Sequence, residues 1–256
     1  MPATAGFFMK RIFHFLSYPF TVLFYLIFGF CLVFFHGIQW VGLNFFGYQA
    51  HKKSVDILNL LILLCLKVLG TSFEFKVPKN IPQDIPIIIV SNHQSLWDIP
   101  PIIWFLRKLH PKFVSKFELG KGIPSVSYNL RHGGSILIKR NNAKQALSEM
   151  IKFSDYLSKN NRSGVIFPEG TRSRKGEAKR FQRKGLELLF KKMPEALVLP
   201  LTINNSWQLQ RYGMFPIPLG VKIKYRLHPL MKVSDFETDV LIDKIEMQIK
   251  SDILPK

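Results

Sequence analysis

A histidine and an aspartate five positions apart are the residues whose types and spacing most directly suggest chemistry. They stand in the segment Asn92-His93-Gln94-Ser95-Leu96-Trp97-Asp98. On a regular helix two such side chains point about 140° apart, and on a strand an odd spacing places them on opposite faces, so they meet only across a turn. A carboxylate that is hydrogen-bonded to one imidazole nitrogen fixes the tautomer and makes the other nitrogen a better base for a hydroxyl group. The alternative is a structural histidine that is satisfied by a local carboxylate.

A second candidate is the segment Phe167-Pro168-Glu169-Gly170-Thr171-Arg172-Ser173, which follows a short apolar run. Gly170 allows the backbone to approach a ligand closely, Thr171 offers a hydroxyl and an amide, and Arg172 offers a fork of donors for phosphate oxygens. The alternative is a turn followed by a solvated basic run, because residues 172–184 contain seven Lys and Arg against a single acidic residue.

From Thr71 onward, short β-rich runs alternate with longer helical patterns. The β-rich runs are Phe73–Val77, Ile87–Ser91, Phe113–Lys116, Ser135–Lys139, Val165–Phe167, Val198–Ile203 and Val221–Leu227. The helical patterns are Ile99–Leu109, Ala143–Ser158, Gln182–Lys192 and Asp239–Ile253. Such alternation predicts an α/β fold with a mostly parallel central sheet flanked by helices.

Polar side chains stand at or just past the carboxyl ends of several of these strands. They are His93, Lys116, Arg140, Glu169 and Asn204. Ligands of parallel sheets bind beyond the carboxyl ends of the strands. We therefore expect these five groups to form a basic pocket that contains a base.

The N-terminal part of the chain has a different character. Residues 12–51 are forty positions without a Lys, Arg, Asp or Glu. About 20 apolar residues span a bilayer once. The tract therefore predicts either one bent, tilted span or a shallow hairpin interrupted near Gly29 or Gly37.

Cationic residues flank this tract on both sides, with Lys10 and Arg11 before it and Lys52 and Lys53 after it. The tendency of positive charge to stay in the cytoplasm places both ends on that side, which favours a hairpin or an in-plane anchor. A second apolar stretch, Ile57–Leu69, is too short to span, and we expect it to lie against the bilayer or the first helix. These patterns predict an N-terminal helical membrane-anchoring region over residues 1–70 and an α/β domain over residues 71–256.

The composition limits the classes of partner. The 256 residues include 36 Lys and Arg against 17 Asp and Glu, a formal net charge of +19, so an anionic partner is expected: nucleic acid, a phospholipid surface or a phosphorylated substrate. A hydrophobic fraction of 47% excludes intrinsic disorder. The two cysteines, Cys31 and Cys65, lie in apolar runs and cannot build a disulfide framework or a Cys-based zinc site, and no metal is expected.

Taken in order along residues 85–205, four blocks resemble those of the glycerolipid acyltransferases typified by 1-acyl-glycerol-3-phosphate acyltransferase. The His-x4-Asp motif matches Asn92–Asp98, and the Pro-Glu-Gly-Thr block matches Phe167–Ser173. The second block of the family resembles Gly134–Arg140, and its apolar-proline block resembles Val198–Leu201. Within the second block this chain departs from the family, since Lys139 stands where an acidic residue is common and Leu137 replaces the usual aromatic residue.

The resemblance implies roles for individual residues. His93 is then the general base that deprotonates the acceptor hydroxyl, Asp98 orients it, and the hydroxyl attacks an acyl thioester without a covalent enzyme intermediate. The acceptor-binding block is then Glu169, Gly170, Thr171 and Arg172, with Arg140 and Lys116 as further phosphate partners. The implied reaction acylates 1-acyl-glycerol-3-phosphate to phosphatidic acid in phospholipid biosynthesis. It takes place at the cytoplasmic face of the cell membrane and needs no cofactor beyond acyl-CoA or acyl carrier protein as donor.

Two other functions are weighed against this one. An acyltransferase that acts on a different lysolipid, such as an amino-acid-based one, stays open because few residues read the acceptor headgroup. A non-catalytic basic module that binds membranes or nucleic acid through residues 172–184 is a more distant alternative, since no nucleic-acid-binding motif is present and such a module has little use for a long uncharged tract. We therefore expect no nucleic-acid partner.

Overall fold

The structure is a computed structural model that describes residues 2–78 and 80–254. Eight strands in this part of the chain form one sheet: β1 Ser72–Phe75, β2 Ile87–Ser91, β3 Lys112–Lys116, β4 Ile136–Ile138, β5 Ser163–Ile166, β6 Leu197–Asn204, β7 Lys222–Leu227 and β8 Met231–Lys232. Their order is β1-β7-β6-β2-β5-β3-β4, and β8 pairs with β6. All pairs are parallel except those of β6 with β7 and of β6 with β8. The predicted α/β fold with a mostly parallel sheet is confirmed.

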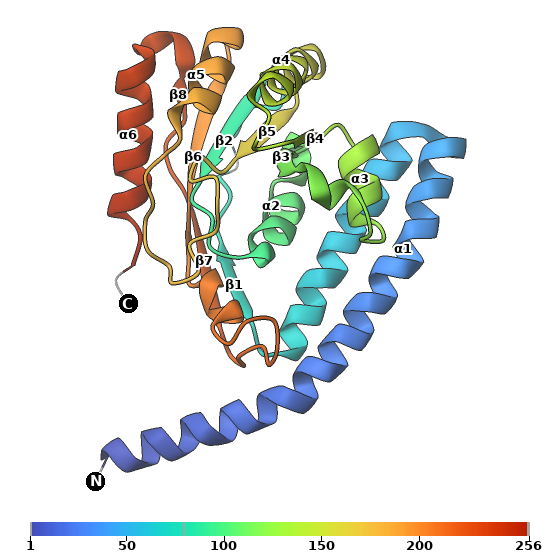
Figure 1. The fold of residues 1–256 in the computed structure, drawn as a ribbon, viewed down its shortest axis with the longest axis vertical. Helices are drawn as coiled ribbons and strands as arrows, with labels where there is room; N and C mark the ends of the chain where they lie inside the picture. Colours follow the sequence, from blue (N-terminus) through green and yellow to red (C-terminus); the bar gives the residue numbers. More distant parts are fainter. Residues whose placement is uncertain (1, 79, 255–256) are drawn as a thin grey trace.

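Helices cover both faces of the sheet. Helices α4 (Ala143–Asn160), α5 (Arg183–Lys192) and α6 (Thr238–Ser251) lie on one face, and α1 (Pro2–Val68) and α2 (Ile99–Phe105) lie on the other (Figure 1). The central strand β2 shows how one sequence serves both layers. Ile87 and Ile89 pack in the core on the α1 and α2 side, and Ile88 and Val90 pack in the core under α4, α5 and α6. Because both faces are covered, the apolar run of β2 is continuous.

Three elements differ from the sequence prediction. Helix α3 (Val126–His132) and strand β8 were not predicted, and the helix predicted over Ile99–Leu109 ends at Phe105 and continues as a 3₁₀ turn over Arg107–Leu109. Helix α3 has only seven residues, and contacts with α1 hold it in place: the Ser125 hydroxyl donates to the Leu32 carbonyl at 2.6 Å. Such short elements are stabilised by tertiary contacts and leave little periodic pattern in the sequence.

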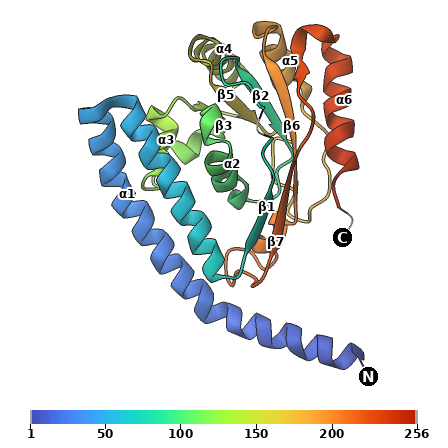
Figure 2. The ribbon, with the colours of Figure 1, turned by 180° about the vertical axis from the view of Figure 1, so that it is seen from behind.

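Helix α1 is a hairpin of two helical arms. The break lies at Gly47, whose φ of 76° and ψ of −166° are open to glycine but not to residues with a Cβ. The second arm then returns alongside the first (Figures 1 and 2). The prediction of a hairpin interrupted near Gly29 or Gly37 is therefore wrong in its position, because both of these glycines lie within the continuous first arm.

The inner face of the hairpin packs on the α/β part of the chain. Phe24 and Phe28 of the first arm contact the Trp97 ring at centroid distances of 5.3 and 5.5 Å. The stretch Ile57–Leu69 forms most of the second arm. Its side chains Leu58, Ile62, Leu66 and Leu69 are buried in the core.

The outer face of the first arm is apolar and exposed. Six of its large apolar side chains are each at least 65% exposed: Phe15, Leu26, Phe30, Val33, Phe45 and Phe46. One helix in the described part of the chain, Arg11–Val68, is long and apolar enough to cross a membrane by length and composition. An exposed apolar surface of this kind typically marks a site of contact with a membrane or another protein.

Candidate active site

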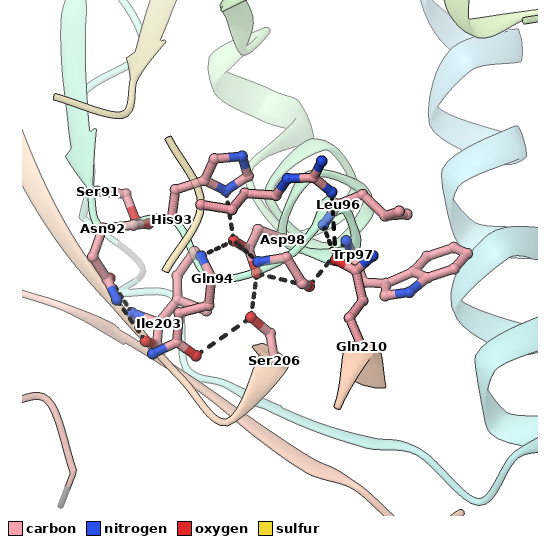
Figure 3. Close-up of polar contacts among 12 residues, drawn as sticks. Ser91, Asn92, His93, Gln94, Leu96, Trp97, Asp98, Ile203, Ser206 and Gln210 are labelled. Atoms are coloured by element: carbon pink, nitrogen blue, oxygen red, sulfur yellow. Dashed lines mark hydrogen bonds and ion pairs between the residues drawn. The ribbon is translucent and has the colours of Figure 1, made fainter. Parts of the chain in front are cut away.

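The turn after β2 carries the His-Asp pair, and it is fastened to the neighbouring strand. The Asn92 side chain donates to the Ile203 carbonyl at 2.8 Å and accepts from the Ile203 amide at 2.7 Å (Figure 3). These two hydrogen bonds to β6 fix the chain at the carboxyl end of β2. His93 therefore starts from a rigid point at the edge of the sheet.

Asp98 lies under His93 and is fully buried. His93 Nδ1 lies 2.8 Å from Asp98 Oδ2, and the backbone amides of Gln94 and Ser95 donate to the same oxygen at 2.7 and 3.0 Å. The Ser206 hydroxyl donates to Asp98 Oδ1, and the Ser95 hydroxyl does so at 3.4 Å. Since a carboxylate only accepts hydrogen bonds, Nδ1 of His93 carries a proton and Nε2 is a free acceptor. Figure 3 shows the far edge of the imidazole pointing away from Asp98.

Local sequence explains this geometry. Ser95 caps the 3₁₀ turn Leu96–Asp98, where its hydroxyl accepts from the Trp97 amide at 3.1 Å, and the Asp98 carboxylate accepts from the Ser95 amide. Pro100 and Pro101 then start α2, where missing N–H groups carry little cost. The expectation that His93 and Asp98 meet across a strand-to-helix turn is confirmed.

The second motif lies against the first. The Phe167 ring stacks on the His93 imidazole at a centroid distance of 4.2 Å, and the Ser173 amide donates to the His93 carbonyl at 2.7 Å. Between them the chain turns at Gly170, whose φ is 68° and whose amide donates to the Phe167 carbonyl at 3.0 Å. The two segments that the sequence singled out therefore form one site.

Arg172 and Thr171 are held by partners outside the motif. The Arg172 guanidinium donates to the Gln210 side-chain oxygen at 3.4 Å, and the Leu96 amide donates to the same oxygen at 3.2 Å. Lys179 donates to the Thr171 hydroxyl at 2.9 Å and to the Arg172 carbonyl at 2.8 Å. Gln210 thus links Arg172 to the turn that carries Asp98.

Glu169 lies beneath the site and is only 5% exposed. Burial raises the pKa of its carboxyl to about 7, against the opposing effect of the backbone amides of Lys179 and His93. Its Oε2 atom is buried without a hydrogen-bond partner. Glu169 is therefore a group that changes charge near neutral pH next to His93.

Lys116 and Arg140 lie together on the rim of the sheet. Lys116 Nζ is 3.4 Å from the Glu118 carboxylate, and Arg140 is exposed and interacts electrostatically with the same carboxylate. Lys116 itself is half-exposed, so the two cations face solvent at the carboxyl ends of β3 and β4. In the described residues they make no hydrogen bond to the His-Asp pair.

Asn204 does not belong to the pocket, contrary to the sequence prediction. Its amide donates to the Asp252 carbonyl at 2.9 Å and its oxygen accepts from the Leu254 amide at 2.9 Å. Both of its polar groups are used to hold the segment after α6. The alternation of side chains along a strand cannot predict this partner, because the two residues are 50 positions apart in the chain.

Two residues of the site, Ser206 and Gln210, were missed by sequence reasoning. Both lie in the 3₁₀ turn Ser206–Gln210 that follows β6, and no motif marks them. Within residues 2–78 and 80–254, no group of three or more His, Cys, Asp or Glu is arranged to hold a metal ion.

The site is thus a histidine-aspartate pair beside a glycine turn, at the carboxyl edge of a largely parallel sheet. A comparison with protein families agrees with this site. The Acyltransferase family model matches residues 72–204, a segment that contains both motifs, and the chain belongs to this family. The chain is therefore an enzyme that transfers acyl groups.

The relatives narrow the comparison further. A 1-acyl-sn-glycerol-3-phosphate acyltransferase of Pseudomonas aeruginosa is 29% identical over 81% of this chain and 80% of its own length. One of Helicobacter pylori is 36% identical over 49% of this chain and 54% of its own length. The crystal structure of the 1-acyl-sn-glycerophosphate acyltransferase PlsC from Thermotoga maritima is similar with a TM-score of 0.77 and 26% identity, and the match covers 95% of this chain and 96% of that one.

Proposed function

We propose that this chain transfers an acyl chain from a thioester to the free hydroxyl of 1-acyl-glycerol-3-phosphate at a membrane surface, giving phosphatidic acid. The observation that carries the proposal is the placement of His93, with Nε2 free, beside the Arg172 turn. The likeness to the 1-acyl-sn-glycerol-3-phosphate acyltransferase of Pseudomonas aeruginosa and to the PlsC of Thermotoga maritima supports this choice of acceptor.

The reaction follows from the tautomer of His93. Nε2 takes the proton from the acceptor hydroxyl while the oxygen attacks the thioester carbonyl carbon. The tetrahedral intermediate then collapses, the carbon–sulfur bond breaks, and the departing thiolate takes the proton back from the imidazolium. Asp98 keeps Nδ1 protonated throughout and stabilises the imidazolium, so His93 and Asp98 act as base and positioning residue.

The acceptor phosphate is expected at the Arg172 turn. A guanidinium binds phosphate oxygens in a bidentate manner, and the Gly170 turn allows backbone amides to approach the same group. Glu169, Gly170, Thr171 and Arg172 are the proposed acceptor-binding block, and Lys116 and Arg140 are proposed as cations on the rim that attract the phosphate groups of acceptor or donor. The donor in this proposal is acyl-CoA or acyl carrier protein, and the reaction needs no resident cofactor because the thioester is already activated.

The membrane part of the proposal rests on the two faces of the hairpin. The inner face contacts Trp97, next to Asp98, through Phe24 and Phe28, while the outer face exposes apolar side chains. A bilayer on the outer face would place the site where the acceptor and the product already reside. Neither lipid would then have to be extracted into water, which costs about 0.8 kcal/mol per CH₂. In this division residues 1–70 anchor the enzyme at the cytoplasmic face and residues 71–256 carry the chemistry.

The test compares His93→Ala with His132→Ala, which removes an exposed imidazole on α3. Each full-length protein is assayed in vesicles with a panel of lysolipids that includes lysophosphatidic acid and an amino-acid-based lysolipid, with acyl-CoA and with acyl carrier protein. We expect His93→Ala to lose activity to background while it still binds vesicles and unfolds cooperatively on heating, and His132→Ala to behave as wild type. Retained activity in His93→Ala would remove the base assignment, and preference for a lysolipid without phosphate would remove the acceptor assignment.

A further inference from the structure

A polar cavity lies at the end of the sheet opposite to His93. It has a volume of about 360 Å³, including its open mouth, and we name it the amino-end pocket. It lies between the second arm of α1 and the start of β3. The polar residues that line it include Tyr48, His51, Lys52, Asp56, Lys112 and Ser135.

The amino-end pocket is separate from the proposed acceptor site. Lys112 is the first residue of β3 and Lys116 is the last, so a five-residue strand lies between them. At about 3.3 Å per residue, the two ends of this strand are about 13 Å apart. A phosphate group in the amino-end pocket therefore lies about one strand length from the carboxyl edge of the sheet, where His93 stands.

Positive charge in the amino-end pocket exceeds negative charge. Asp56 is already engaged by Lys52, with 2.5 Å between Nζ and Oδ2. Lys112 is only 6% exposed, and in the described part of the chain it forms no ion pair within 4 Å. Lys112 and Arg162 both contact the ring of Tyr48, at 4.9 and 4.8 Å from its centroid. Two buried or half-buried cations therefore lie over one aromatic ring, and neither forms an ion pair with a carboxylate of the described residues.

Several polar atoms around the amino-end pocket lack partners. Both ring nitrogens of His51 and the Nε atom of Arg162 are buried without a hydrogen bond. Burial, followed by the charges of Arg162 and Lys52, lowers the pKa of Lys112 to about 7. Buried polar atoms are satisfied in most native proteins, so this group of unpartnered atoms indicates a missing polar partner.

We propose that the amino-end pocket binds a phosphate group. A phosphate offers several anionic oxygens in a compact tetrahedron. This suits the ammonium of Lys112, which lines the cavity, and the guanidinium of Arg162, which lies over the same Tyr48 ring. Phe45 and Phe46, next to the break at Gly47, are 69% and 73% exposed, so an anionic phospholipid is one source of this group and phosphate in solution is another.

The experiment measures how fast a small amine-reactive reagent modifies Lys112 in the full-length protein, by mass spectrometry of the labelled peptide. Lys108, which is exposed nearby in the chain, serves as the internal control. One arm adds inorganic phosphate in detergent solution, against chloride at equal ionic strength. The other arm uses phosphatidylcholine vesicles with and without phosphatidic acid.

A bound phosphate group blocks the reagent and keeps Lys112 protonated. At a phosphate concentration ten times its Kd we expect labelling of Lys112 to slow about tenfold, with no change at Lys108. Protection by inorganic phosphate supports binding from solution, and protection only by phosphatidic acid vesicles supports binding of a lipid headgroup. Absence of specific protection in both arms overturns the proposal.

A variant pair tests the geometry. Arg162→Gln removes one proposed phosphate donor, and Arg131→Gln removes the same charge from an exposed position on α3. Neither residue belongs to the proposed active site, so both variants should keep acyltransferase activity. We expect protection of Lys112 to fall severalfold in Arg162→Gln and to stay at the wild-type level in Arg131→Gln. Full protection in Arg162→Gln would contradict the assignment.

Discussion

Asp98 and Lys112 are charged side chains buried at opposite ends of the same sheet, and they differ in how their charge is met. Asp98 is fully buried and accepts hydrogen bonds from His93, two backbone amides and Ser206. Lys112 is almost as buried, yet its close neighbours are an aromatic ring, other cations and Asp56, a carboxylate that is already paired with Lys52. Burial of a charge is costly unless partners replace its hydration. The protein itself supplies these partners at the carboxyl end, whereas at the amino end it leaves room for a ligand.

The origin of the difference lies in the chain. The partners of Asp98 are mostly within five residues of it, since a capped 3₁₀ turn directs consecutive amides at one carboxylate. The groups around Lys112 come from separate elements, namely Tyr48 and Lys52 of α1 and Arg162 before β5. A local turn can satisfy a charge completely, while a junction of distant elements leaves a cavity.

The substitution Asp98→Asn is expected to have the largest effect, because it disrupts the hydrogen bonds that Asp98 accepts at the carboxyl end of the sheet. The new amide group would direct N–H donors at the amides of Gln94 and Ser95 or at Nδ1 of His93, so the imidazole loses its orientation. We expect kcat to fall about 10³-fold, within the range of a general base that is displaced, while KM changes little. Steady-state kinetics measure this split, and thermal unfolding checks that the variant folds. A loss of kcat below about tenfold would contradict the role of Asp98.

The substitution Lys112→Met tests the other end, where we expect a gain in stability. The pKa of Lys112 is lowered to about 7, so its charged form is disfavoured in the folded state. The unfolded state then binds more protons between pH 7 and pH 10, and the stability of the wild type rises with pH across this window. Met is apolar and of similar length, so the free energy of unfolding should rise by a few kcal/mol below pH 7 and converge with the wild type near pH 10.

Denaturant unfolding of both proteins at several pH values measures this effect, with Lys108→Met as the exposed control. Saturating phosphate should narrow the gap, because it stabilises only the protein that has the cation. A variant that is less stable than wild type at every pH would show that Lys112 is already satisfied.

What could be predicted from the sequence follows the same division between local and distant contacts. The meeting of His93 and Asp98 could be predicted because five residues and a strand-to-helix turn determine it. The roles of Ser206 and Gln210 could not, since they reach the site from more than 100 residues away along the chain and carry no motif. Asn204 was misplaced for a related reason, because its partner is the segment after α6.

The hairpin illustrates the same limit. A glycine within an apolar tract signals a break only if the chain beyond it can pack back on the chain before it. Cys31 of the first arm lies close to Cys65 of the second, and the position midway between them is residue 48, next to Gly47. The charge-free tract drew attention to residues 12–51 alone, whereas the stretch Ile57–Leu69 determines where the turn must be.

Glu169→Gln tests whether the carboxyl end of the sheet also holds a buried charged group without enough hydrogen-bond partners. Burial raises the pKa of Glu169 from 4.5 to about 7, so between these values the folded state keeps a proton that the unfolded state has released. Stability of the wild type therefore falls as pH rises from 4.5 to 7, by about 3 kcal/mol from this group. Unfolding free energies of Glu169→Gln should lack this fall. Equal pH dependence in the two proteins would mean that Glu169 is ionised at no cost.

The smallest expected effect belongs to Ser206→Ala, which removes one donor from Asp98 and leaves the others. The hydroxyl reaches Asp98 Oδ1, while His93 and the amides of Gln94 and Ser95 hold Oδ2. Because the oxygen that faces the imidazole keeps all of its partners, kcat should fall only a few fold and the free energy of unfolding by about 1 kcal/mol. The ratio of kcat losses in Asp98→Asn and Ser206→Ala measures how redundantly the carboxylate is held. If Ser206→Ala lost as much activity as Asp98→Asn, the distant turn after β6, and not the local cap, would be what orients His93.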